Sequence, residues 1–286
     1  MSYRIITDSC CDFPREMYDQ LQLSYTSLSV TYQGQSRSSY TRQWMKQMYD
    51  GLRVGEEAKT AAANPQNWQE VMEPWLQQGE DLLVMAFSSG LSTTYQSAEI
   101  AAAELREQYP ERSIFVVDTR SASLGQGLLV YYACRKRDEG MALEDLYHWV
   151  EENKFHLAHW FTVDDLMYLK RGGRVSAATA LLGTMLQIKP VLHMDDEGHL
   201  ISMAKARGRK ASIDALAKKM EETGLPGEND LVFICHGDCL EDAEYLAKVV
   251  KEKCGVKEAF IDYTGAVIGS HSGPGTLALF FYGTER

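Results

Sequence analysis

The chain has 286 residues, of which 45% are apolar and 24% are charged, and it carries a formal net charge of −11. This is the composition of an ordinary globular protein, and the length suits two domains. The negative charge argues against a general nucleic-acid binder and against attachment to an anionic membrane surface. The sequence has neither an apolar run of bilayer length nor a secretory signal, so we expect a cytoplasmic protein without stable membrane insertion. Two of the six cysteines, Cys10 and Cys11, are adjacent and the other four are scattered, which predicts that most are reduced thiols.

Predicted strands alternate with predicted helices in the first half of the chain. Strands are expected at residues 3–7, 24–32, 82–87 and 113–117, and helices after Pro14 and at residues 41–52, 68–77, 95–109, 124–137 and 143–153. Asp12 is the predicted cap of the first helix. Residues 59–65, KTAAANP, read as a loop of small and polar residues. The alternation predicts a parallel sheet flanked by helices.

Polar residues follow three of these predicted strands. They are Thr7-Asp8-Ser9, Ser88-Ser89-Gly90 and Asp118-Thr119. Because ligands bind outside the carboxyl ends of strands in open parallel sheets, we expect all three groups near one edge of the domain. For Asp8 and Asp118, a loop or capping role explains the sequence equally well.

Residues 81–98 combine a buried strand, a hydroxyl-rich loop and the start of a helix. The loop supplies the hydroxyls of Ser88, Ser89, Ser92, Thr93 and Thr94. The first turn of a helix has unpaired N–H groups and a partial positive charge, which favour an anion. The stretch therefore suits a carboxylate or a phosphate, although one of these residues must also cap the helix.

The second half of the chain has a different pattern. We expect strands at residues 157–162, 231–235 and 259–263, a hairpin at 189–194 and 199–204, and helices at 164–170, 176–187, 211–223 and 240–254. Ser176 is the predicted cap of the helix at 176–187. An apolar segment, 276–282, ends the chain. The predicted fold class is therefore α/β with two domains: a parallel-sheet α/β domain at 1–155 and an α+β domain with a mixed sheet at 156–286.

Two further features are candidate sites. His271 lies in a glycine-rich segment, residues 268–275, where an imidazole has the freedom to donate a hydrogen bond to an acidic group; a tight connection is the alternative. Basic residues cluster at 170–174, KRGGR, and again at 205–210. In an acidic protein such clusters are candidate docking or anion-binding sites, and a solvated loop is the alternative interpretation. The spacing within residues 235–239, CHGDC, fits no zinc site, and the sequence has no phosphate-binding loop or nucleophile elbow. We expect neither a metal nor a cofactor.

Taken together, these motifs resemble the DegV family over essentially the whole chain. The residues that carry the resemblance are Thr7-Asp8-Ser9, Lys59-Thr60 through Asn64-Pro65, 88–98, 166–176 (LMYLKRGGRVS), Lys189-Pro190 and 268–275. The resemblance implies a two-domain protein that buries one long-chain fatty acid in an apolar tunnel between its domains. It also implies a carrier without catalysis of its own. A separate kinase would phosphorylate the carboxylate to an acyl phosphate for phospholipid synthesis.

The resemblance also assigns residues. By position, Thr60, Ser92 and His271 match the residues that would hold the carboxylate. The matches for docking to the fatty acid kinase are Arg171, Arg174 and Arg207.

Two positions depart from the family pattern. Ala61 stands where serine is usual, in a longer loop, and Thr93 stands where glycine is usual. The first change removes a hydroxyl and the second adds a Cβ, so Ser89 or Thr93 itself is the expected compensating donor.

Two other functions remain open from the sequence. One is a phosphotransfer or acyl-transfer enzyme that uses His271 or Ser92 as its nucleophile, which needs an activating base or a metal. The other is a regulatory module that senses a lipid and reports it to a partner.

Overall fold

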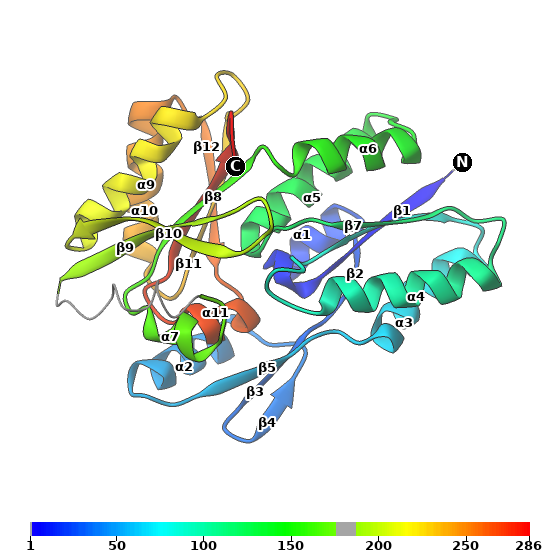
Figure 1. The fold of residues 1–286 in the computed structure, drawn as a ribbon, viewed down its shortest axis with the longest axis horizontal. Coiled ribbons are helices and arrows are strands. Elements are labelled where there is room, and N and C mark those ends of the chain that lie inside the picture. Colours follow the sequence, from blue (N-terminus) through cyan, green and yellow to red (C-terminus); the bar gives the residue numbers. More distant parts are fainter. Residues whose placement is uncertain (1, 176–186) are drawn as a thin grey trace.

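The structure, a computed structural model, describes residues 2–175 and 187–286. The chain forms a four-stranded, a six-stranded and a three-stranded sheet (Figure 1). The predicted helix at 176–187, with its cap Ser176, lies outside the described residues except for its last position.

The four-stranded sheet forms the N-terminal half and is parallel throughout, in the order β2-β1-β6-β7. Its strands are β1 (Tyr3–Asp8), β2 (Ser24–Thr26), β6 (Asp81–Ala86) and β7 (Ile114–Asp118). Every residue of β6 is buried, as its continuous apolar run predicts for a strand covered on both faces. Helices α3 (Pro65–Gln77) and α4 (Thr94–Gln108) pack on it, as does α6 (Leu143–Asn153). The predicted parallel α/β arrangement is confirmed.

The single strand expected at residues 24–32 is wrong, because this stretch contributes to two sheets. β2 pairs with β1, whereas β3 (Ser29–Tyr32) pairs antiparallel with β4 (Gln35–Arg37) and β5 (Ala58–Ala61). The chain passes from one sheet to the other between them, where the N–H of Leu28 donates to Ser9 Oγ at 3.1 Å. β5 also corrects the loop expected at 59–65: pairing with β3 makes a strand of residues without an apolar alternation.

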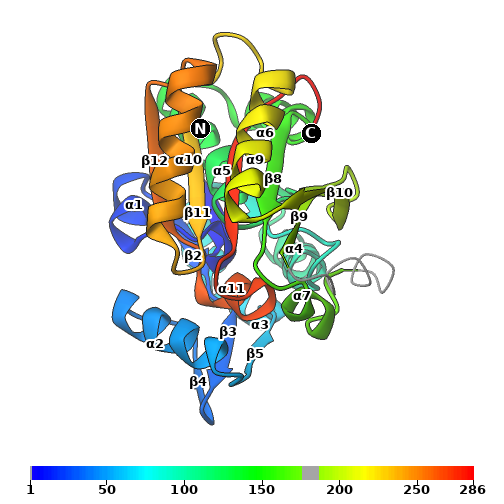
Figure 2. The same ribbon diagram turned by 90° about the vertical axis from the view of Figure 1, so that its left-hand side faces the viewer.

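The small three-stranded sheet lies with α2 (Arg42–Arg53) at one end of the molecule (Figure 2). The hydroxyl of Thr41 caps α2 by accepting the N–H of Trp44 at 3.2 Å. Next to them lie α11 (Ala266–Ser272) and α7 (Met167–Arg171), which pack against each other. The glycine-rich segment at 268–275 therefore contains most of a short helix.

The six-stranded sheet of the C-terminal half is mixed, in the order β10-β9-β8-β13-β11-β12. Among the described strands of this sheet, only β11 and β12 pair in parallel, and the hairpin of β9 and β10 is present as predicted. The strands are β8 (Leu157–Thr162), β9 (Ile188–Met194), β10 (Leu200–Arg207), β11 (Leu231–His236), β12 (Glu258–Tyr263) and β13 (Leu277–Tyr282). Helices α9 (Arg209–Thr223) and α10 (Leu240–Cys254) cover its outer face (Figures 1 and 2). This confirms the predicted α+β half.

Helix α5 (Ser123–Asp138) lies between the two large sheets and joins them. One hydrophobic core includes Ile5 and Leu83 from the parallel sheet, Leu128 from α5, and Phe233 from the mixed sheet. Gly125 permits this approach, because a Cβ there would lie 2.2 Å from His159 Nε2. The division of the chain at residue 155 stays a prediction.

The prediction that Asp12 caps the first helix is wrong, because Asp12 does not cap α1 (Arg15–Gln20). It ends a short 3-10 helix, η1 (Ser9–Cys11), with a left-handed φ of 54°, and Pro14 takes the N-cap position of α1. The Asp12 carboxylate instead accepts a hydrogen bond from Ser123 Oγ at 2.5 Å. Asp12 therefore ties η1 to the first turn of α5.

Candidate functional site

A cavity of about 470 Å³ lies where the two halves of the chain face each other. This volume is in the range of small-molecule binding sites. One wall is the inner face of the mixed sheet, and the others come from α11, the loop after β6, β5 and the start of α5. Apolar lining residues include Leu28, Phe87, Leu91, Phe161, Leu169, Met194, Leu200, Val267, Ile268, Ala278 and Phe280. The five residues predicted to bind a carboxylate all line it: Thr60, Ser89, Ser92, Thr93 and His271.

Thr60 and His271 form a direct pair at the cavity. Thr60 Oγ1 lies 2.7 Å from His271 Nε2, although the residues are 211 positions apart in the chain. Burial lowers the pKa of His271 to about 4, with a smaller contribution from the positive charge of Arg174. The imidazole is therefore neutral at pH 7, so the pair offers an uncharged N–H or O–H donor to a ligand.

The backbone around His271 allows close packing on both sides. Gly273 ends α11 with a φ of 79°, a conformation that favours glycine. A Cβ at Gly172 would lie 2.3 Å from His271 Nδ1, so this glycine of the KRGGR segment admits the ring. A second contact anchors α11, because Tyr49 donates its hydroxyl to the carbonyl of Thr264 at 2.7 Å.

Ser92 and Ser89 are both half-buried, but their hydroxyls have different partners. Ser92 Oγ lies 2.8 Å from Thr94 Oγ1 and accepts the N–H of Thr94, at the first turn of α4. Ser89 Oγ donates to Asp118 Oδ2 at 2.5 Å. Because the Ser89 hydroxyl already donates its hydrogen bond to Asp118, Ser92 is the better placed of the two serines to donate to a ligand. Thr93 is exposed at the rim of the cavity.

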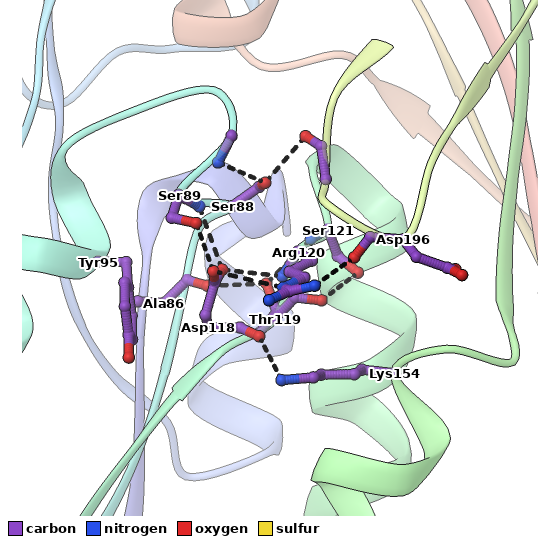
Figure 3. Close-up of polar contacts among 12 residues, drawn as sticks. Ala86, Ser88, Ser89, Tyr95, Asp118, Thr119, Arg120, Ser121, Lys154 and Asp196 are labelled. Atoms are coloured by element: carbon purple, nitrogen blue, oxygen red, sulfur yellow. Dashed lines mark hydrogen bonds and ion pairs between the residues drawn. The ribbon is translucent and has the colours of Figure 1, made fainter. Parts of the chain in front are cut away.

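The polar residues that follow the parallel strands meet at one edge, as predicted. Asp8 Oδ2 accepts the N–H of Phe87 at 2.7 Å. Asp118 Oδ1 accepts the N–H groups of Ser89 and Arg120 (Figure 3). The amine of Lys154 donates to the carbonyl of Asp118 at 3.0 Å. In this structure, Asp8 and Asp118 hold loops in place, which is the alternative role that the sequence allowed.

The same edge holds the turn of the β9–β10 hairpin. The Ser88 hydroxyl donates to the carbonyl of Gly198 at 3.0 Å, and Arg120 Nη1 donates to the carbonyl of Asp196 at 2.6 Å (Figure 3). The hairpin contributes Met194 and Leu200 to the cavity wall. These two hydrogen bonds therefore fix one side of the cavity to the parallel sheet.

The three arginines predicted to contact a kinase differ in their exposure to solvent. Arg171 and Arg207 are exposed, with the Arg171 guanidinium 4.7 Å from the centre of the Tyr168 ring. Arg174 is half-buried and lines the cavity, where its Nε donates to the carbonyl of Leu91 at 3.2 Å. Its charge also acts on His271. We therefore expect Arg174 to affect ligand binding directly.

The two departures from the family pattern have different consequences. Ala61 is exposed at the end of β5, and the residues that line the cavity are its neighbours Thr60 and Ala62. A missing hydroxyl at Ala61 therefore leaves the cavity surface unchanged. Thr93 does line the cavity, so its added side chain can contact a ligand.

Sequence reasoning missed a group of buried polar residues that line the cavity. These lining residues are Ser123, His159, Cys235, Thr264 and Ser272. The available signal was a polar residue inside the apolar run 157–162, at a position that the strand alternation turns toward the interior.

Burial also shifts the pKa of titratable groups elsewhere in the molecule. It raises the pKa of Asp8 to about 6 and that of Asp12 to about 7. It lowers the pKa of His193 and of His236 to about 4, and that of His159 well below its usual value. All six cysteines lie among the described residues and are free thiols, as predicted.

Residues 2–175 and 187–286 contain neither a candidate metal-binding cluster nor a helix that could span a membrane. Within these ranges, three or more histidine, cysteine or acidic side chains do not gather in a way that would hold a metal ion. Over the same ranges, the helices lack the combination of length and apolar character that a bilayer crossing requires.

Known proteins resemble this chain along its whole length. A family model described as "Uncharacterised protein, DegV family" matches residues 2–284. A DegV domain-containing protein of Clostridium perfringens is 46% identical over 287 residues, which cover 99% of this chain and 98% of that protein.

Solved structures agree with this assignment. A DegV family protein from Thermus thermophilus, described as fatty acid binding, is 31% identical with a TM-score of 0.88 and covers 99% of this chain and 100% of its own. A DegV lipid binding protein from Thermotoga maritima is 27% identical with a TM-score of 0.86 and covers 100% of both chains. The chain belongs to the DegV family.

Proposed function

We propose that the protein binds one long-chain fatty acid, with its carboxylate at Thr60, Ser92 and His271 and its acyl chain inside the cavity. The observation that carries this proposal is the Thr60–His271 pair at a cavity lined by many apolar side chains. The description of DegV relatives as fatty acid binding proteins supports it.

The chemistry of the pair suits a carboxylate that must be held and later released. A buried carboxylate is costly unless donors face it, and hydrogen bonds to a charged acceptor are stronger than those between neutral groups. Thr60 and His271 supply donors without a full counter-charge, while Arg174 adds a positive charge nearby. The acyl chain contributes most of the affinity, at about 0.8 kcal/mol per buried methylene before the costs of association.

We further propose that the bound carboxylate is presented to a separate fatty acid kinase. Thr60, Ser92 and His271 are half-buried rather than fully enclosed, so a partner can approach them. Arg171 and Arg207 are exposed, which suits docking to an acidic surface.

The geometry favours a carrier over an enzyme. Ser92 has its hydroxyl against Thr94 rather than against a histidine, and His271 pairs with a hydroxyl rather than with an orienting carboxylate. Neither arrangement activates a nucleophile. A lipid-sensing module remains the alternative, which differs from the carrier in its partner.

The test uses delipidated protein, a fatty acid, ATP and a bacterial fatty acid kinase. We expect fatty acid binding by the protein alone, and acyl phosphate only when the kinase is added. Arg171→Ala should bind fatty acid normally but support slower acyl-phosphate formation. Lys248→Ala, a change at an exposed position of α10, is the matched control and should leave the rate unchanged.

Each part of the proposal has its own contradictory result. Failure of the delipidated protein to bind any fatty acid would contradict the carrier function. Normal acyl-phosphate formation with Arg171→Ala would rule out the docking role of this residue, and turnover of ATP and fatty acid without the kinase would favour the enzyme.

A further inference from the structure

Helix α11, which carries His271, depends on its neighbours for its position. It has seven residues, and an isolated helix of this length is marginal in water. The helices α2 and α7 lie against it (Figures 1 and 2). Because His271 Nε2 is 2.7 Å from Thr60 Oγ1, a small shift of α11 would break this contact. The residues that hold α11 in place therefore also hold the imidazole at the proposed carboxylate site.

Two tyrosines from these neighbouring helices pack on glycines of α11. Gly269 and the C-cap residue Gly273 are four positions apart, so they lie on the same side of the helix. A Cβ at Gly269 would lie 2.2 Å from the hydroxyl oxygen of Tyr49, which belongs to α2. A Cβ at Gly273 would lie 2.4 Å from the ring of Tyr168, which belongs to α7. Both rings therefore press directly on the backbone of α11, where a larger residue would not fit.

Tyr168 is also fixed at its other end. Its hydroxyl donates to the carbonyl of Leu52, in the last turn of α2, at 2.6 Å. The side chain therefore spans from α2 to the C-terminal end of α11. Gly172, which follows α7, contacts the imidazole itself, because a Cβ there would lie 2.3 Å from His271 Nδ1. The segment 168–172 thus holds both the end of α11 and the ring of His271.

We propose that Tyr168 is a positioning residue of the carboxylate site, which holds α11 so that the His271 imidazole stays against Thr60. Tyr168 is not among the residues that line the cavity, so its effect on a ligand passes through its neighbours. Its hydroxyl fixes the ring between the two helices, and the ring fixes the end of α11. This inference rests on the proposed function, because it assumes that the carboxylate binds at Thr60 and His271.

The experiment measures the dissociation constants of delipidated protein for palmitic acid and for methyl palmitate, by displacement of a fluorescent fatty acid. Tyr168→Leu removes the ring and its hydrogen bond, and should bind palmitic acid about three- to tenfold more weakly. Methyl palmitate should lose less affinity, because hydrogen bonds to a neutral acceptor are weaker than those to a carboxylate. Tyr168→Phe keeps the ring on Gly273 and should restore part of the affinity for palmitic acid.

A double-mutant cycle with His271→Ala shows whether the effect passes through the imidazole. Once His271 is absent, adding Tyr168→Leu should change the affinity for palmitic acid by less than about twofold. Tyr245→Leu is the matched control, because Tyr245 is a half-buried tyrosine of α10 that does not line the cavity. Its hydroxyl also donates a hydrogen bond, to Asp214 Oδ1 at 2.7 Å. This variant should bind both ligands with wild-type affinity.

The outcomes separate this inference from the proposed function. Wild-type affinity of Tyr168→Leu for palmitic acid would overturn the inference. An equal loss for methyl palmitate, or an undiminished loss in the His271→Ala background, would also overturn it, because Tyr168 would then act on the fold rather than on the imidazole. If Tyr168→Leu does not fold, Tyr168→Phe decides alone, and its binding palmitic acid as tightly as wild type would overturn the inference. Failure of the wild-type protein to bind palmitic acid would instead contradict the proposed function.

Discussion

Replacing His271 with alanine tests the proposed carboxylate site. The change removes the imidazole that lies 2.7 Å from Thr60 Oγ1 at the cavity. We expect fatty acid binding to weaken and the fold to remain. The imidazole is half-buried and neutral, so its loss leaves no charge without a partner.

The size of the effect follows from the bond that is lost. A hydrogen bond to a charged group contributes about 1.5–3 kcal/mol, which corresponds to an affinity about tenfold to a hundredfold lower. The free energy of unfolding should change by less, about 1 kcal/mol, because Thr60 is half-buried and can bond to water instead.

In the assay, delipidated protein is titrated with palmitic or oleic acid, and the heat of binding is measured by isothermal titration calorimetry. Urea unfolding is the stability control. His148→Ala is the matched variant, because His148 is exposed on α6 and is not among the residues that line the cavity. It should bind with wild-type affinity. An unchanged dissociation constant for His271→Ala, with the protein folded, would refute the assignment of the carboxylate site.

Three further predictions concern the same structure. Arg174→Ala should weaken fatty acid binding several-fold, less so at high salt, because it removes a positive charge near His271; an affinity equal to wild type would show that this charge does not reach the ligand. Gly198→Ala should lower the free energy of unfolding by about 1–3 kcal/mol, because φ is 80° and the new Cβ would lie 2.1 Å from Ser88 Oγ. Gly227→Ala, with a φ of 81° and open space around it, measures the backbone strain alone. If urea unfolding shows that both variants lose the same free energy of unfolding, the steric clash with Ser88 is not the cause of the loss at position 198. The free energy of unfolding should also fall as the pH drops from about 6.5 to about 4. Over this range histidines bind protons in the unfolded chain, whereas four buried histidines with lowered pKa values stay neutral in the folded protein: His159, His193, His236 and His271. Asp8, Asp12 and Asp262, whose pKa values burial raises, act in the opposite direction but are fewer than the four histidines, so urea unfolding that is flat or more stable at pH 5 than at pH 7 would contradict the prediction.

Local patterns predicted the elements whose packing matches their sequence. The apolar run in β6 and the alternation of strands and helices identified the parallel sheet, and the acidic turn identified the β9–β10 hairpin. The stretch at 24–32 misled because its apolar alternation continues across the residues where the chain leaves one sheet for another. β5 depends on its pairing with β3, a tertiary contact that no local pattern contains.

The candidate site shows the same division. The hydroxyl loop and the glycine-flanked histidine stood out in the sequence, but their residues came together as one site only through the resemblance to DegV proteins. Side-chain direction was beyond reach: the Ser89 hydroxyl turns to Asp118, and Arg174 turns to the cavity. Both orientations depend on how distant segments pack.

Mass spectrometry of the protein as purified tests the central claim most directly. The protein is measured in its native state and again after extraction with organic solvent, and the extract is analysed for lipids. The account predicts one added mass per chain that extracts as a long-chain fatty acid. Protein that carries no such mass, and that takes up no fatty acid when it is added, would contradict the account.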